Sequence, residues 1–195
     1  MENTTGNSSG TRRLTESALL IALATALSLY KLFEAPYGGA VTLGSMIPIM
    51  LISIKYRFGW SLIAALAYSL IQMMTGFWAP PIEEFLYYAL MILLDYVIAF
   101  GVLCLAGPIY NSLKKKIPPR IGLIIAVIVC FSLRFLCHFT SGIIIWGVYA
   151  PEGQAAWLYS LLYNGGYMLF ECIISGGILF VAGPQLIAIL EGKRR

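Results

Sequence analysis

The sequence predicts an all-α membrane protein: a bundle of six transmembrane helices with a short second helix and both termini in the cytoplasm. The composition is the first observation behind this, because 59% hydrophobic residues, 11% charged residues and a mean hydropathy of +0.83 exceed what soluble domains show. The second is the placement of the 13 Lys and Arg residues, since all but Lys31 and Arg134 fall in four clusters between apolar stretches. These clusters are Arg12 and Arg13; Lys55 and Arg57; Lys114, Lys115, Lys116 and Arg120; and Lys193, Arg194 and Arg195. Lys and Arg accumulate in short cytoplasmic loops, so all four clusters are expected on the cytoplasmic side.

The apolar stretches set the expected order of the elements. We expect a disordered cytoplasmic N-terminus over residues 1–13, a membrane domain over 14–190 and a basic cytoplasmic tail over 191–195. Within the membrane domain, the helices are expected at 14–33, 43–54, 59–75, 83–106, 121–145 and 156–190. Turn residues at 36–39 and the Gly107-Pro108 pair are typical of helix ends.

The expected second helix is too short to cross a bilayer. Its roughly 12 residues contain Pro48, and about 20 are needed for a straight span. A short segment at membrane depth must hide its free backbone groups in protein or in a polar cavity. The short helix therefore indicates a site nearby.

Several classes of function are disfavoured by the sequence. The net charge of +4 is accounted for by the cytoplasmic clusters, so no nucleic-acid surface is expected, and only the Lys114 run and the basic tail are expected to touch anionic membrane lipid. The four cysteines lie in apolar segments and form no CxxC pair, so we expect no metal site and no disulfide framework. The pattern GxxxxGK[ST] is missing, so ATP hydrolysis by that route is excluded, and no cofactor is expected.

Four ionisable residues fall deep in the expected helices: Asp95, Arg134, His138 and Glu171. Each costs at least about 2.5–3.5 kcal/mol at a helix centre, so all four should face the interior. Arg134 and His138 are four residues apart and lie on one helix face. With a neutral histidine the four sum to one negative charge, which suits a monocationic ligand if they are close together. Arg134 could instead pair with Asp95 or Glu171 only to hold the bundle together.

Aromatic residues gather at the outer ends of the last two helices. They are Trp146, Tyr149, Trp157, Tyr159, Tyr163 and Tyr167, with Asn164 among them. Tyr149 and Trp157 are also typical of an interfacial aromatic belt. Trp146 follows His138 by eight residues, about two helical turns, which predicts a shared face. Such rings with an amide and a carboxylate could form a cage for a flat cationic heteroaromatic.

Two segments carry a resemblance to a known family. Residues 134–153, RFLCHFTSGIIIWGVYAPEG, and residues 94–100, LDYVIAF, resemble the thiamine-specific substrate-binding subunits of energy-coupling factor transporters, the ThiT family. The resemblance implies that the thiamine pocket is lined by Asp95, Tyr96, His138, Gly142, Trp146, Tyr159 and Asn164. The family often has Glu where this chain has Asp95, and its first outer loop supplies an aromatic lid, for which Tyr37 is the candidate. No catalytic residue and no resident metal are implied.

The resemblance also implies partners and a location. Ala18, Ala22 and Ala26 form a stripe of small residues on the first helix. This stripe would dock on a transmembrane coupling subunit, with two cytoplasmic ATPases supplying energy for vitamin import across a prokaryotic plasma membrane. Packing inside the bundle is the other interpretation of the stripe.

Three alternative functions stay open. One is a sister subunit for another vitamin, such as riboflavin, or for a thiamine precursor. Another is an autonomous proton-coupled carrier that uses Asp95, His138 and Glu171, although no inverted repeat supports it. The last is an intramembrane enzyme that uses His138 with Asp95, for which no nucleophile-elbow or HExxH motif is found.

Overall fold

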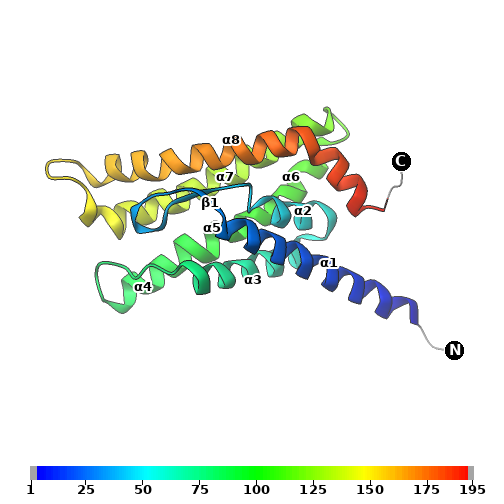
Figure 1. Ribbon diagram of the computed structural model, residues 1–195, viewed down its shortest axis with the longest axis horizontal. Coiled ribbons are helices and arrows are strands. Elements are labelled where there is room, and N and C mark those ends of the chain that lie inside the picture. Colours follow the sequence, from blue (N-terminus) through cyan, green and yellow to red (C-terminus); the bar gives the residue numbers. More distant parts are fainter. Residues whose placement is uncertain (1–3, 193–195) are drawn as a thin grey trace.

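The computed structural model describes residues 4–192, with side chains from residue 10 onward. Over these residues the chain forms six main helical segments, two short 3-10 helices and one small β-hairpin (Figure 1). In chain order the elements are α1 (Thr4–Leu29), β1 (Lys31–Glu34), η1 (Pro36–Gly38), β2 (Ala40–Thr42), α2 (Ile47–Lys55), α3 (Phe58–Gly76), α4 (Phe85–Met91), η2 (Ile92–Ile98), α5 (Ala99–Gly101), η3 (Val102–Leu105), α6 (Ala106–Leu113), α7 (Pro119–Ile144), η4 (Trp146–Tyr149) and α8 (Ala156–Leu190). The predicted all-α bundle is confirmed, with the hairpin as an addition.

Four helices are long and apolar enough to cross a membrane: α3, the continuous segment from α4 to α6, α7 and α8. Helix α2 has only nine residues and lies in the centre of the bundle, with Ile47 to Ile54 all buried. Its backbone is thereby shielded by protein, as a short segment at membrane depth requires. Helix α1 is long, but its first half carries Arg12, Arg13 and Glu16.

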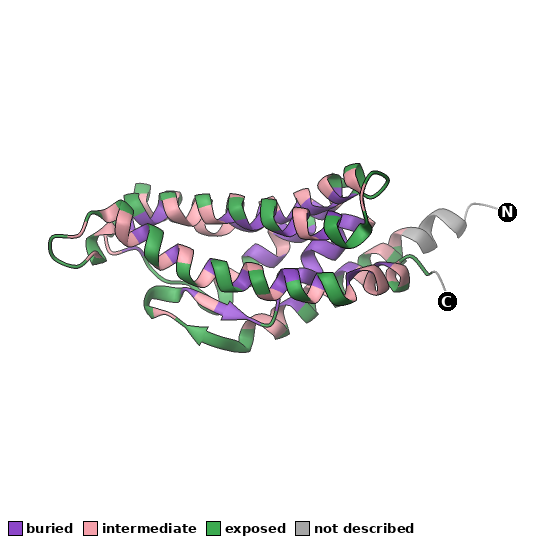
Figure 2. Cartoon of the chain, turned by 90° about the horizontal axis from the view of Figure 1, so that it is seen from above, coloured by how far each residue is buried: buried purple, intermediate pink, exposed green. Residues whose placement is uncertain are grey.

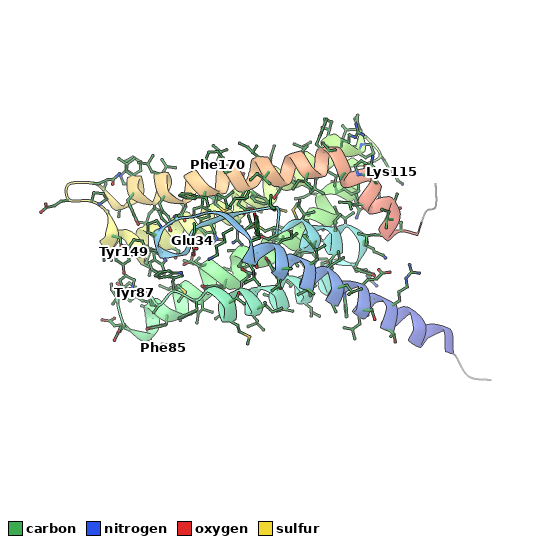
Figure 3. All side chains as sticks on the ribbon, viewed as in Figure 1. Glu34, Phe85, Tyr87, Lys115, Tyr149 and Phe170 are labelled. Carbon is green, nitrogen blue, oxygen red and sulfur yellow. The ribbon has the colours of Figure 1, made fainter. Side chains whose placement is uncertain are left out.

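The two ends of the bundle differ in character. Figure 3 shows Lys115 at one end and Tyr149, Tyr87 and Phe85 at the opposite end. The start of α1, the turn from α2 to α3 and the end of α8 lie at the Lys115 end (Figure 1). The described basic clusters therefore share one end, as expected for the cytoplasmic side. The cluster at residues 193–195 lies outside the described residues.

Several boundaries differ from those predicted. Helix α1 begins at Thr4, whereas the sequence predicts disorder through residue 13, because polar residues can extend a helix that the apolar residues after them nucleate. It ends at Leu29 instead of Phe33, and the next residues pair as the antiparallel hairpin of β1 and β2. The segment that begins with α4 continues to Leu113, past Gly107-Pro108.

Gly107 explains why that segment continues. Its backbone N–H donates to Ser53 Oγ at 2.7 Å, and a Cβ at this position would meet the Ser53 carbonyl oxygen at 2.0 Å. Glycine therefore serves here to bring α6 against α2, not to end the helix.

A polar network fixes α1 at the cytoplasmic end. The Glu16 carboxylate accepts hydrogen bonds from Arg12 Nε (2.8 Å), Lys55 Nζ and the Tyr56 hydroxyl. Burial, with the hydrogen bond to Glu16, raises the pKa of Tyr56 to about 12, so this hydroxyl stays protonated and donates. Trp60 Nε1 donates to Ser17 Oγ at 2.9 Å. These contacts hold one face of α1 against the turn between α2 and α3.

Buried residues lie between the helices and exposed residues lie on the outside (Figure 2). Many of the exposed residues are large and apolar. Tyr68, Met50 and Leu123 are among the fully buried side chains. Leu19, Phe170 and Ile173 are at least 59% exposed. In a membrane protein such outward-facing apolar residues match the hydrocarbon around it.

Candidate functional site

A cavity of about 580 Å³ opens between the hairpin and helices α3, α7 and α8, with η2 along one wall. The volume falls in the range of small-molecule sites. It is lined by all eight residues that were predicted to contact a ligand: Tyr37, Asp95, Tyr96, His138, Gly142, Trp146, Tyr159 and Asn164. The structure thus brings together residues from four separate parts of the chain.

Asp95 is the hub of the polar contacts in the cavity. It accepts hydrogen bonds from Ser141 Oγ (2.6 Å) and Trp146 Nε1 (3.2 Å) on Oδ2, and lies 2.9 Å from His138 Nδ1 through Oδ1. It sits in η2, a π-helical stretch in the middle of a long apolar helix. π-Helical turns are rare and are frequent at functional sites, where the extra residue per turn redirects a side chain.

The contact with Asp95 orients the histidine ring. In the neutral form of His138, Nδ1 carries the proton that bonds the carboxylate, which leaves the lone pair on Nε2. Nε2 is buried and has no hydrogen-bond partner among the described residues. The ring therefore retains one unused acceptor beside the cavity.

Close packing of α7 on α8 builds the next layer. A Cβ on Gly142 would meet Ser160 Oγ at 2.1 Å, so only glycine allows this approach. Ser160 Oγ donates to the Phe139 carbonyl at 2.8 Å, and Asn164 Nδ2 donates to the His138 carbonyl at 3.2 Å. The two helices are thus joined by polar contacts at the level of the histidine.

The hairpin covers the mouth of the cavity. At its tip, Tyr37 stacks on Tyr149 with ring centroids 4.0 Å apart and meets the edge of Trp78 at 6.3 Å. Tyr163 holds the same tip from α8, because its hydroxyl donates to the Pro36 carbonyl and accepts the Gly39 N–H at 3.0 Å. Tyr37 has φ 63°, an uncommon conformation for a residue with a side chain, which the contacts around it maintain.

At the inner end of the cavity, Arg134 and Glu171 lie one and two helical turns further toward the cytoplasmic end than His138 and Asn164. Arg134 Nη1 donates to the Ala99 carbonyl at 3.1 Å, and its guanidinium lies 4.0 Å above the ring of Phe100. Glu171 accepts the backbone N–H of Thr42. No ion pair within 4.0 Å joins Arg134 to Asp95 or Glu171, so the sequence-based alternative of a structural ion pair has no support in the described part of the chain.

The predicted shared helix face of His138 and Trp146 is wrong, because α7 ends at Ile144 and Trp146 begins the short helix η4. From η4 the Trp146 indole still donates to Asp95 Oδ2 at 3.2 Å. The two side chains converge on Asp95 without sharing a helix face.

Sequence reasoning also missed part of the lining. Trp78, Gln72, Ser45 and Tyr68 come from segments read as a loop or as packing helices. Ser141 bonds Asp95 although it had no predicted role. A signal was available for Ser141, because it lies three residues after His138 and therefore on the same side of the helix.

Ala18, Ala22 and Ala26 are all exposed on the outer side of α1. Ser17 and Ala24, on the other side of the same helix, are buried. Packing of the alanine stripe inside the bundle is therefore excluded, and the stripe lies on the outer surface.

An aromatic cavity with a carboxylate at its hub, covered by a hairpin and set in a bundle of apolar helices, defines a membrane-embedded binding protein for a small organic molecule. The family model described as thiamine transporter protein matches residues 14–190. The chain belongs to this family, and it is a multi-pass protein of the plasma membrane.

Individual relatives agree with this assignment. The thiamine transporter ThiT of Bacillus subtilis is 31% identical over 186 residues, which cover 90% of this chain and 93% of the relative. The thiamine transporter ThiT of Lacticaseibacillus paracasei is 33% identical over 110 residues, 52% of this chain and 55% of the relative. A solved structure of ThiT from Listeria monocytogenes superposes with a TM-score of 0.69 at 26% identity, covering 92% of this chain and 98% of that one.

Proposed function

We propose that this chain is the thiamine-binding subunit of an energy-coupling factor importer. It captures thiamine from outside, encloses it beneath the hairpin and delivers it through a coupling subunit driven by two ATPases. The observation that carries the proposal is Asp95 at the hub of an aromatic cavity, in a chain whose family is that of thiamine transporters.

The chemistry of the cavity fits this ligand. Thiamine consists of two flat aromatic rings joined by a methylene group, and it bears one positive charge on its thiazolium ring. The lining residues Asp95, Arg134 and Glu171 carry one net negative charge when His138 is neutral. The other charged lining residues, Lys31 and Glu34, pair with each other and add no net charge. Aromatic faces attract such a cation by about 0.5–2 kcal/mol each. The unused acceptor on His138 Nε2 suits the amino group of the pyrimidine.

Closure and delivery involve different surfaces. The hairpin, with Tyr37 at its tip, would exclude water from the bound vitamin and so strengthen its polar contacts. The outer stripe of Ala18, Ala22 and Ala26 would dock on the coupling subunit, because small residues permit a close approach between helices.

The first test is calorimetry of the purified chain with thiamine and its phosphates. We expect each chain to bind one thiamine molecule, and we expect that riboflavin does not displace it. In Asp95→Asn, affinity for thiamine should fall at least about tenfold, and affinity for an analogue with a neutral ring in place of the thiazolium should fall less, because only the cation loses the charge interaction. An equal loss for both ligands would make the carboxylate structural, and failure of thiamine to bind the unmodified protein would overturn the proposal.

A further inference from the structure

Glu171 is a carboxylate in the middle of α8 with no exposed surface. Buried carboxylates in membrane helices ordinarily pair with a cation. This one instead accepts the backbone N–H of Thr42, a residue 129 positions away at the base of the hairpin. Its other oxygen, Oε2, has no hydrogen-bond partner among the described residues.

A cation lines the same cavity but does not pair with Glu171. Arg134 is 94% buried, and its Nε has no hydrogen-bond partner among the described residues. No Arg134 nitrogen lies within 4.0 Å of a Glu171 oxygen. A cationic and a carboxylate side chain thus line one cavity, and each has a buried polar atom without a hydrogen-bond partner among the described residues. Leaving such groups unmatched is costly, so another feature must hold them apart.

That feature is the base of the hairpin. Thr42 is fixed beside α2 because its Oγ1 donates to Ser45 Oγ at 2.9 Å and accepts the Ser45 N–H at 3.2 Å. The backbone N–H of Thr42 then donates a hydrogen bond to Glu171 Oε1. The hairpin is thereby held at two places on α8, at its tip by Tyr163 and at its base by Glu171.

We propose that Glu171 is the positioning residue that holds the hairpin closed over the cavity, and that Arg134 is its alternative partner when the hairpin lifts. Lifting the hairpin removes the Thr42 N–H from Glu171. Arg134 lies on the neighbouring helix, one turn closer to the cytoplasmic end than His138, and then forms an ion pair with the Glu171 carboxylate. The open form therefore has no unpaired buried charge. Closure exchanges this ion pair for the hydrogen bond to the hairpin. The inference rests on the proposed function, because the hairpin controls exchange of a bound ligand.

The two substitutions at Glu171 should act in opposite directions. Glu171→Ala removes the acceptor for Thr42, so thiamine should dissociate at least about tenfold faster, the effect of losing one charge-assisted hydrogen bond. Glu171→Gln keeps an oxygen for the Thr42 N–H but cannot form an ion pair with Arg134, so dissociation should be unchanged or slower. The rate is followed by stopped-flow tryptophan fluorescence, with Ser175→Ala as the control for a buried polar residue one turn further along α8.

A second pair of variants tests the other end of the same hydrogen bond and does not depend on the folding of Glu171→Ala. Thr42→Pro removes the backbone N–H and should accelerate dissociation to a similar extent, whereas Thr42→Ser keeps both the N–H and the hydroxyl that bonds Ser45 and should have less than about a threefold effect. The effects of Glu171→Ala and Thr42→Pro should not add, because both break one contact.

Three outcomes would overturn the inference while leaving thiamine binding intact. Equal acceleration by Glu171→Ala and Glu171→Gln would mean that the charge acts on the ligand directly. Unchanged rates in both would mean that the hairpin is held elsewhere. Full additivity of Glu171→Ala with Thr42→Pro would mean that the two residues act independently. Failure of the unmodified chain to bind thiamine would instead refute the proposed function.

Discussion

Trp146 contributes both an aromatic face and a hydrogen-bond donor to the cavity. Its ring lies 6.2 Å from that of Tyr149, and its Nε1 donates to Asp95 at 3.2 Å. A substitution here removes a wall of the site and one of the donors that hold the carboxylate. The indole therefore supports ligand binding in two ways.

We predict that Trp146→Ala weakens thiamine binding by at least about tenfold, because an aromatic contact and an Asp95 partner are lost together. The matched control is Trp157→Ala, since Trp157 is 53% exposed and does not line the cavity. Quenching of the remaining tryptophan fluorescence by thiamine gives both affinities. Equal affinities for the two variants would contradict the role given to Trp146.

The identity of these residues was predictable because ionisable and aromatic side chains are conspicuous in apolar helices. Asp95, His138 and Asn164 needed no structure to be singled out. Their mutual geometry was not predictable. A 3.6-residue period does not foresee the π-helical stretch around Asp95 or the break of α7 at Ile144.

At the scale of elements, the site depends on how closely α7 and α8 approach. Gly142 and Ser160 touch at the level of His138 and Asn164, so this contact sets the width of the cavity. A methyl group at residue 142 would have to displace Ser160 Oγ or separate the helices.

We expect Gly142→Ala to destabilise the protein by about 1–3 kcal/mol, the usual cost of overpacking, and to weaken thiamine binding. The control is Gly166→Ala on α8, where an added Cβ meets nothing within 4 Å and helix propensity should slightly favour alanine. Adding Ser160→Ala to Gly142→Ala should restore part of the stability, because the closest clashing atom is then gone. Thermal unfolding in detergent measures all three effects, and a Gly142→Ala midpoint no lower than that of Gly166→Ala would refute the argument.

Helices α3, α7 and α8 were predicted to within two residues at each end. Helix α8 is the clearest case, at Ala156–Leu190. The hairpin was not predicted, because Lys31 to Phe33 continue the apolar run of α1, and their exposed strand exists only through pairing with Ala40 to Thr42. Local propensity does not reveal this strand pairing, because contacts from Tyr163 and Glu171 on α8 stabilise the hairpin.

At the scale of the whole molecule, the cavity and the alanine stripe occupy separate surfaces. Ala18, Ala22 and Ala26 do not line the cavity, and the network around Glu16 fixes α1 so that the stripe faces outward. Under the proposed function, ligand capture and docking on a coupling subunit can therefore be impaired one at a time.

A bulky side chain in the alanine stripe should impair docking alone. Ala22→Trp should leave thiamine affinity within about twofold and should reduce co-purification with the coupling subunit and ATPases at least about fivefold, because an indole prevents the close approach that small residues allow. The matched control is Val181→Trp on α8, a position 69% exposed and outside the stripe, where assembly should be retained. Both variants are compared by calorimetry and by the amount of partner retained on an affinity column. If assembly survives in Ala22→Trp, or is lost equally in Val181→Trp, the docking surface lies elsewhere on the molecule, whereas loss of thiamine binding in Ala22→Trp would show that α1 and the cavity are coupled after all.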